Sequence, residues 1–477
     1  MTEPQVLSST SIQAIDWDGP NDPENPRNFS SRRRLLSVLA VTGLAFVSTF
    51  AASVYSPGID EVASTYGTTV ELATLPLSIF NLGLAFGPLI GAPLSETFGR
   101  KVVFLVTSPI FALFTLGAAF STSLTSLTIC RFFAAVFASP AVSNASASIT
   151  DYTAGQHRAL SLSFYYSIPT TGALLGPLVG GFVVLGKGWR WTQYVTIFFV
   201  VAFFIPVIFT RESYKKRLLE QRAKRRGIAR PASAKKSLPQ LIHHFLIVLF
   251  LRPVHMLLTE PIVTLVCVYS GFLFGLLYTF VISSPWVFAK YYNFDITGQS
   301  LIFLSPVIGT ASTPIPLFLI DRFITQPQCK HFEAEAPGTQ FPPERRLSPA
   351  LIGSIALPIT LFIFAWTVRP EIHWIVPLVF QGLAMQCSVM IYAPTNMFMI
   401  DSYGPLYGAS ASGAAMLSRY LLSAAFPLFT LQMYRALGVG WATTLLAFCT
   451  LAMAPIPWLF YRYGSRLRAK SKYETSS

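Results

Sequence analysis

The sequence predicts an all-α membrane protein in which twelve spanning helices form two six-helix bundles. Three observations support this fold class. Hydrophobic residues make up 52% of the 477 residues and charged residues only 12%, whereas soluble domains contain about 25% charged residues. The apolar residues form runs of about 20, the length that crosses a bilayer as a helix. A long basic connector separates the sixth run from the seventh, which divides the chain into two similar parts.

The apolar runs define the elements in order. We expect spans at 35–57, 72–94, 102–121, 126–150, 159–185, 191–210, 260–285, 298–320, 348–368, 374–397, 408–434 and 440–461. The chain then divides into an N-terminal tail 1–34, a first bundle 35–211, a linker 212–259, a second bundle 260–461 and a C-terminal tail 462–477.

Basic residues orient these elements. Cytoplasmic loops of membrane proteins carry an excess of Lys and Arg, and here these residues gather in the linker 212–259. An even number of spans places both tails on the same side, which we expect to be the cytoplasm. The net charge of +14 then reflects topology, and nucleic-acid binding explains it less well. We expect the linker to be a solvated tether that can also meet anionic lipid headgroups, with a helix at the membrane interface within 238–258.

The fifth run carries a glycine pattern suited to close packing. Gly172, Gly176 and Gly180 are four residues apart and share one helix face, and Gly181 follows them. Pro177 removes a backbone donor and can bend the helix. Small residues at this spacing let a second helix approach closely, although the spacing alone more often marks ordinary packing.

A second motif follows the second run and has a weak echo after the eighth. The first copy holds Glu96, Gly99, Arg100 and Lys101, and the second holds Asp321 and Arg322. A carboxylate gains about 0.3–1 kcal/mol near a helix N-terminus, so we expect Glu96 to face the start of the eleventh span. We expect Arg100 to pair with Asp151 at the end of the fourth span. Both contacts would hold the halves together in an outward-facing state. The alternative is that the motif consists of ordinary turn residues together with the basic residues expected on the cytoplasmic side.

Both motifs resemble those of one family. The glycine pattern is similar to the antiporter motif Gly-x-x-x-Gly-Pro-x-x-Gly-Gly in the fifth helix of drug-exporting major facilitator proteins. Asn25-Pro-Arg-Asn-Phe and Gly188-Trp-Arg-Trp-Thr also look like segments of the twelve-span fungal drug:proton antiporters, a branch with polyamine, fluconazole-resistance and secondary-metabolite exporters. The resemblance implies the major facilitator fold around a central cavity, with the proton gradient as energy source and no cofactor.

Two arginines lie within predicted spans. A charge at mid-membrane costs at least about 2.5–3.5 kcal/mol, so we expect Arg131 and Arg419 to face a wet cavity or a polar partner. The resemblance implies a part in proton coupling for Arg131, which matches an arginine of the family's fourth helix. Arg419 and the acidic residue Asp151 are the other candidates for proton coupling. Alternatively, each arginine has a purely structural role and donates hydrogen bonds to carbonyl groups.

Polar and aromatic side chains within apolar spans are candidates for lining a substrate cavity. They are Asn81, Tyr165, Tyr166, Tyr269, Tyr278, Gln381, Gln386 and Asn396. Ile282 stands where polyamine-exporting relatives often have a glutamate. Since a polycation in a low-dielectric cavity needs a paired anion, this favours a neutral or anionic, largely apolar cargo.

The sequence therefore predicts a secondary transporter that exports hydrophobic drugs, toxins or a fungal secondary metabolite in exchange for protons. A proton-coupled importer or facilitator, and a transport-inactive sensor, are the alternatives. The cysteines are scattered, which argues against an enzyme and against a metal site. The sequence contains no phosphate-binding loop, which argues against direct use of ATP. We expect a monomer whose partners are lipid, protons and a small molecule, in the plasma membrane or else a vacuolar or vesicle membrane.

Overall fold

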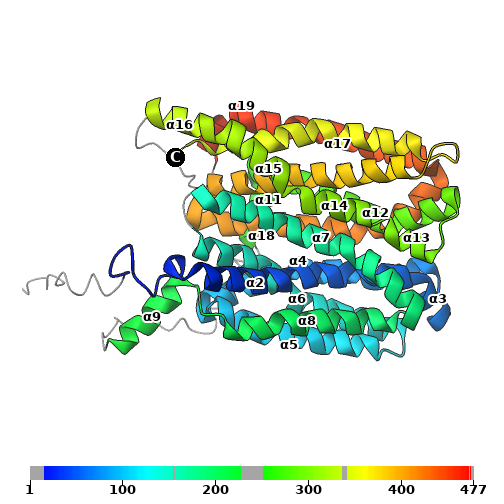
Figure 1. Ribbon diagram of the computed structural model, residues 1–477, viewed down its shortest axis with the longest axis horizontal. Coiled ribbons are helices and arrows are strands. Elements are labelled where there is room, and N and C mark those ends of the chain that lie inside the picture. The colour runs from blue at the N-terminus through cyan, green and yellow to red at the C-terminus, as the bar shows by residue number, and fades with distance from the viewer. Residues whose placement is uncertain (1–15, 154–155, 227–250, 336–340, 472, 474–477) are drawn as a thin grey trace, which may run out of the picture.

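The computed structural model describes residues 16–153, 156–226, 251–335, 341–471 and 473. In Figure 1 the long helices run side by side, and the described chain begins and ends at the same end of the molecule. We call this end, which carries α9 and α16, the basic end; the other, at α3 and α13, is the distal end.

The first bundle contains six long helices. They are α2 (Ser31–Ser53), α4 (Val70–Phe98), α5 (Arg100–Ala119), α6 (Leu124–Tyr152), α7 (Gln156–Lys187) and α8 (Arg190–Phe209). The turns η1 (Pro26–Asn28) and η2 (Ser56–Gly58) and the short α3 (Ile59–Tyr66) flank α2. α6 packs against α2, α4 and α5, while α8 covers α2 and α5.

The second bundle has more interruptions. Its elements are α12 (Pro261–Tyr292), α13 (Ile296–Leu301), α14 (Leu304–Ser312), α15 (Pro314–Ile320), the π-helical turn η4 (Asp321–Thr325), α16 (Gln326–Glu335), η5 (Pro343–Leu347), α17 (Ser348–Thr367), α18 (Ile375–Met453) and α19 (Pro455–Ala469). The span expected at 298–320 is divided among α13, α14 and α15, with Pro314 at the start of α15. Proline is tolerated there because the first turn needs no backbone donor.

Hydrogen bonding joins α18 over 79 residues, but its backbone is not continuously helical. Gly404 has φ 59° and ψ −165°, and Gly438 has φ 75° and ψ 162°. Glycine reaches these positive φ angles without steric cost. Eleven segments of the described chain are long and apolar enough to cross a membrane, against twelve expected, and the last of them runs over 63 residues, from Tyr407 to Ala469. The difference lies in this segment, since Gly438 falls between the spans expected at 408–434 and 440–461.

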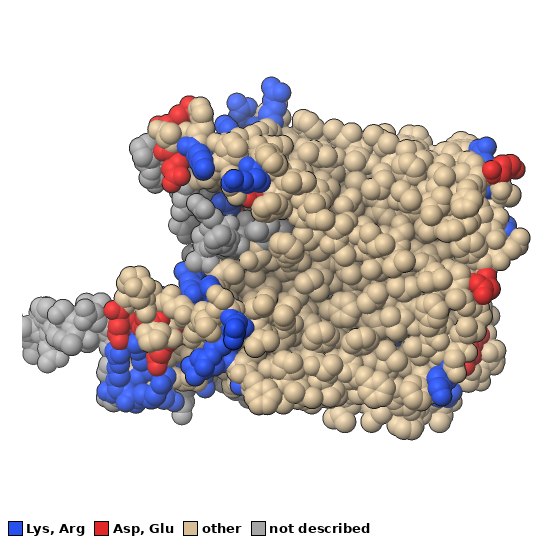
Figure 2. All heavy atoms as spheres, viewed as in Figure 1, with Lys and Arg blue, Asp and Glu red and all other residues tan. Residues whose placement is uncertain are grey.

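The surface between the two ends is apolar. Phe209 is 82% exposed, and Leu113, Ile315 and Trp441 are also exposed. Figure 2 shows Lys, Arg, Asp and Glu at the two ends of this face, with uncharged side chains between them. Such a belt suits contact with lipid hydrocarbon, which offers nothing to solvate a charge.

The linker is tied to the N-terminal tail at the basic end. α9 (Lys215–Arg225) carries Arg222, whose Nη1 lies 2.6 Å from Asp22 Oδ2 and whose Nη2 lies 2.7 Å from Asp18 Oδ2. Arg222 and Asp22 are both buried. Burial opposes ionisation of Asp22, but backbone donors and Arg222 outweigh it and lower the pKa of Asp22. Around α9 the linker is therefore not the solvated tether that we expected.

The rest of the linker is only partly described. The structure describes α11 (Arg252–Thr259) just before the second bundle. Most of the expected interfacial helix, residues 238–250, lies outside the described residues.

Candidate functional site

The glycine face of α7 lies against α2, within the first bundle. A Cβ atom added at Gly172 would be 2.8 Å from the carbonyl oxygen of Phe46, and one at Gly176 would be 2.7 Å from the backbone nitrogen of Val54. A Cβ at Gly180 would also meet Val54. The two backbones thus touch along two turns of helix, an approach that any side chain would prevent.

Gly181, the next residue, faces the other bundle. A Cβ there would be 2.8 Å from Ser300 Cβ, on α13, and would also meet Ser300 Oγ. At the same end Arg435 Nη1 lies 3.6 Å from Glu71 Oε1. Nearer the middle of α7, the hydroxyls of Thr171 and Thr310 are 3.0 Å apart and also join the bundles. α7 therefore contacts both bundles through neighbouring glycines. In this structure the bundles are joined at the distal end.

The loop motif after α4 is organised by a residue that the sequence analysis did not single out. Gly99 has φ 99° and separates α4 from α5. The backbone N–H groups of Arg100 and Lys101 donate to the Glu212 carboxylate over 2.8 and 3.1 Å. A carboxylate at a helix N-terminus satisfies free donors and favours the helix dipole. Glu212 therefore caps the N-terminus of α5. We had expected the same kind of interaction between Glu96 and the start of the eleventh span.

The pair expected between Arg100 and Asp151 is present, with Nε 3.5 Å from Oδ2. Asp151 also accepts from Ser213 Oγ at 3.1 Å. Both members of the ion pair belong to the first bundle, so the expectation that this pair joins the halves is wrong. The side chain of Glu96 lies outside the described residues.

The remaining motif residues also interact within one bundle. Lys101 Nζ donates to Ile208 O at 2.8 Å. Gln326 contacts both members of the second copy, donating to Asp321 Oδ2 at 3.0 Å and accepting from Arg322 Nη1 at 3.4 Å. Among the described ion pairs, the one that joins the two bundles is Arg435–Glu71 at the distal end.

Arg131 is buried and surrounded by carbonyl groups. Its Nε donates to Pro76 O at 3.0 Å, and its Nη2 donates to Ala51 O and Ala52 O at 3.0 and 3.1 Å. Nη1 donates to Gln193 Oε1 at 3.4 Å. The guanidinium carbon lies 4.7 Å from the centroids of the Tyr55 and Phe80 rings. This geometry ties α2, α4, α6 and α8 together, and it matches the structural alternative for this arginine.

Arg419 is equally buried but has a different environment. Its Nε donates to Ala415 O on its own helix at 3.2 Å. The guanidinium carbon lies 4.7 Å from the Tyr392 ring centroid and 5.2 Å from that of Phe274. Neither Arg131 nor Arg419 forms an ion pair among the described residues, and Asp151 contacts neither of them. The structure does not bring the three coupling candidates together.

Four of the cavity candidates lie at or beside the contact between the bundles. Asn396 Nδ2 donates to the Tyr166 hydroxyl at 3.1 Å, and Asn81 Nδ2 donates to Ser423 O at 3.4 Å. Tyr165 adjoins Tyr166, with ring centroids 5.5 Å apart.

The other cavity candidates differ in position. Tyr278 is buried near Asn81, Arg131 and Tyr420. Gln381 donates to Ser284 Oγ at 2.8 Å and Gln386 to Ser312 Oγ at 3.1 Å, both within the second bundle. Tyr269 is buried in α12.

Two residues that we had not singled out, Tyr392 and Phe274, lie in the same cluster as Tyr166 and Asn396. Tyr392 packs edge-on against Tyr166 with ring centroids 5.1 Å apart, and against Phe274 with centroids 5.2 Å apart. Helical spacing could have identified Tyr392, because it lies four residues before Asn396 on the same face. Phe274 is one of 40 phenylalanines, and nothing in its local sequence distinguishes it.

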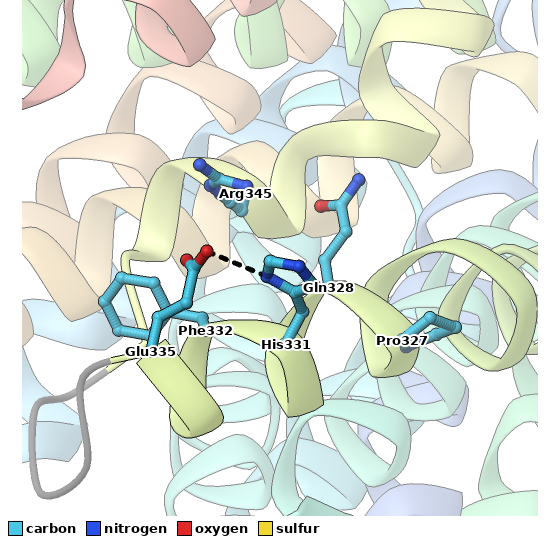
Figure 3. A pocket seen from close by; sticks show the side chains of 6 residues that line it. All are labelled: Pro327, Gln328, His331, Phe332, Glu335 and Arg345. Carbon is cyan, nitrogen blue, oxygen red and sulfur yellow. Dashed lines mark ion pairs between the residues drawn. The ribbon is translucent and has the colours of Figure 1, made fainter.

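A separate pocket lies at the basic end, outside the bundle centre. α16 and η5 form it from Pro327, Gln328, His331, Phe332, Glu335 and Arg345. Figure 3 shows His331 directed at Glu335, with Nδ1 3.4 Å from Oε1. Both side chains are largely exposed, so the pair adds little stability. This pocket contains none of the candidates above.

Comparison with known proteins gives a consistent result. The family model described as Major Facilitator Superfamily matches residues 41–427. The chain is 36% identical to the MFS-type transporter traF of Penicillium crustosum, over 97% of this chain and 94% of that protein. It is 36% identical to the efflux pump FUBT of Fusarium oxysporum, covering 95% and 76%, and 33% identical to polyamine transporter 4 of Saccharomyces cerevisiae, covering 96% and 73%.

Solved structures share the fold at low sequence identity. The proton:xylose symporter XylE, bound to 6-bromo-6-deoxy-D-glucose, superposes with a TM-score of 0.65 at 14% identity, covering 91% of this chain and 97% of that one. A partially occluded inward-open structure of the xylose transporter XylE from E. coli gives a TM-score of 0.62 at 15% identity, covering 90% and 99%.

Proposed function

Because the chain belongs to the Major Facilitator Superfamily, we propose that it exports apolar small molecules from the cytoplasm in exchange for protons. Several relatives are efflux pumps by name, including FUBT of Fusarium oxysporum and radE of Floropilus chiversii. In this proposal the basic end, with both tails, faces the cytoplasm, and the plasma membrane is the expected location.

The position of α7 carries the proposal. Gly176 lets α7 lie against α2, and Gly181 lets it lie against α13 of the other bundle. A helix attached to one bundle and touching the other through a glycine can keep its first contact while the second opens. The two bundles would then rock between inward- and outward-facing states, and opening of the distal end would separate Gly181 from Ser300 and Glu71 from Arg435.

The proton would be carried by an acid that changes partners during this motion. Asp151 is the acidic coupling candidate, and Arg100 is its ion-pair partner at the basic end. Arg131 would support transport indirectly, by fixing the helices around it.

The charge of the cargo depends on which charged side chains lie near the middle of the membrane. Ile282 is buried in α12, in the place where polyamine-exporting relatives often have glutamate. The predicted spans place no acid at mid-membrane, so a polycation entering the centre would lose its hydration without gaining a counter-ion. We therefore favour neutral or anionic cargo.

Transport into inside-out membrane vesicles tests direction and energy source together. With an acidic lumen, the protein should concentrate an apolar dye such as Nile red, and a protonophore should abolish this concentration. Vesicles without the protein control for partitioning of the dye into lipid. Accumulation that requires ATP, or that ignores the proton gradient, would contradict proton antiport.

A further inference from the structure

The two buried arginines, Arg131 and Arg419, differ in how many hydrogen bonds they make. Arg131 donates to three backbone carbonyls and to the Gln193 amide. Arg419 makes one described hydrogen bond, from Nε to Ala415 O. An arginine is always charged and presents five N–H donors, so the interactions of Arg419 leave much of its binding capacity unused.

The surroundings of Arg419 offer aromatic rings in place of an anion. Tyr392 and Phe274 lie near its guanidinium, and the titratable groups that act on it are Tyr420, Tyr166, Tyr165 and Cys267. A ring face near a desolvated cation offsets only part of the free energy that desolvation of the ion costs. No described carboxylate pairs with Arg419, so the charge stays uncompensated in this state.

This cation lies where the two bundles meet. Tyr392 touches Tyr166 of the first bundle, and Asn396, one helical turn from Tyr392, donates to the Tyr166 hydroxyl. The Asn396 Oδ1 atom is buried without a partner in the structure, and Asn396 is 1% exposed. A buried acceptor without a donor costs free energy, and the Asn396 amide shares its partner Tyr166 with the Tyr392 ring that lies beside Arg419.

We propose that Arg419 anchors the carboxylate of an aromatic monocarboxylate, whose ring packs against Tyr392 and Phe274. Guanidinium and carboxylate match as a two-bond pair, and ring–ring contact with two aromatic side chains supplies the apolar part of recognition. The free Asn396 oxygen would accept from a hydroxyl or amide donor on the same molecule. The inference rests on the proposed transport function and narrows its substrate class.

Access to Arg419 is linked to separation of the bundles. Its guanidinium lies over the Tyr392 ring, and the same ring contacts Tyr166 of the first bundle edge-on. Moving the bundles apart at this level removes the Tyr166 contact and lets Tyr392 turn away. The anion would then replace one ring face next to the cation.

Equilibrium binding to the purified full-length protein in detergent tests the proposal without transport. The probes are aromatic monocarboxylates, 2-naphthoate and 1-pyrenebutyrate, each beside its neutral primary amide. The carboxylates should bind more tightly than the amides, and Arg419→Gln should weaken carboxylate binding by roughly 10- to 150-fold, the range for a buried hydrogen bond to a charged group. Amide binding should change little.

Two further variants make the result specific. Arg466→Gln removes an exposed arginine of α19 and should leave the carboxylate preference intact. If Arg419→Gln does not fold, Arg419→Lys keeps the charge without the planar fork and should retain a weaker preference. Equal binding of carboxylate and amide, no binding of any carboxylate, or an unchanged preference in Arg419→Gln would overturn the assignment. Proton-driven dye transport could still be observed in that case, whereas failed dye transport with intact carboxylate preference would count against the proposed function alone.

Discussion

Adding one methyl group at Gly181 should favour the state in which the distal end is open. The Cβ of Gly181→Ala would lie 2.8 Å from Ser300 Cβ, about 0.6 Å short of the 3.4 Å at which ordinary contact begins. The added Cβ would also displace Ser300 Oγ, which donates to Ile296 O at 2.9 Å and would lose that hydrogen bond. Overpacking of this kind costs about 1–3 kcal/mol, which corresponds to a shift of roughly 5- to 150-fold between two states.

Cross-linking across the distal end measures this shift. Glu71 and Arg435 form an ion pair between the bundles, so cysteines in their place should be joined by a short bifunctional maleimide when that end is closed. The five native cysteines are replaced first. Gly181→Ala should lower the yield of the cross-link.

Gly186→Ala is the matched control, because it lies in the same helix and its Cβ would meet no heavy atom within 4 Å. It should cross-link like the parent protein. If Gly181→Ala also cross-links like the parent, or if Gly186→Ala shifts the yield as far, the contact does not govern closure of the distal end.

Other predictions follow from the contacts described above. Gly176→Leu should lower the melting temperature of the purified protein while changing the distal cross-link little, since it crowds the backbone of α2 within the same bundle. Arg131→Gln should destabilise the protein by at least about 1–3 kcal/mol in thermal unfolding, because it strands buried carbonyl groups; an unchanged melting temperature would contradict that role. The lowered pKa of Asp22 makes its pairing with Arg222 independent of pH above the ordinary value of 3.8. That pairing should be lost only as the pH falls below 3.8, with hydrogen exchange in the tail as the readout. The parent protein should not restore spermine tolerance to yeast lacking polyamine exporters, whereas Ile282→Glu should shift preference towards cations.

Hydropathy and glycine spacing predicted much of the fold, because both are local properties of the chain. The runs of apolar residues correspond to the long helices, and the face formed by Gly172, Gly176 and Gly180 is indeed a close helix contact. Spacing shows that such a face exists but not which helix covers it. Only the structure shows that Gly176 contacts α2 of its own bundle whereas Gly181 contacts α13 of the other bundle.

The candidate site was harder to predict, because partners distant in sequence decide each side chain's role. Arg131 and Arg419 look alike in sequence, and they differ only in what tertiary packing places around them: carbonyl groups for one, aromatic rings for the other. Glu212 lies more than a hundred residues from the N–H groups that it accepts from. Nothing in its local sequence connects it with α5.

An uncompensated cation at the centre of a transporter also affects the use of membrane voltage. Exchange of a neutral molecule for one proton moves one elementary charge across the membrane per cycle, whereas exchange of a monoanion moves two in the same electrical sense. Each charge is worth about 2.3 kcal/mol per 100 mV, so an interior-negative potential of this size would add about 4.6 kcal/mol to anion export, roughly three orders of magnitude in the attainable gradient. If Arg419 selects carboxylates, export would be driven by voltage as well as by pH, and it would persist after the pH gradient has collapsed.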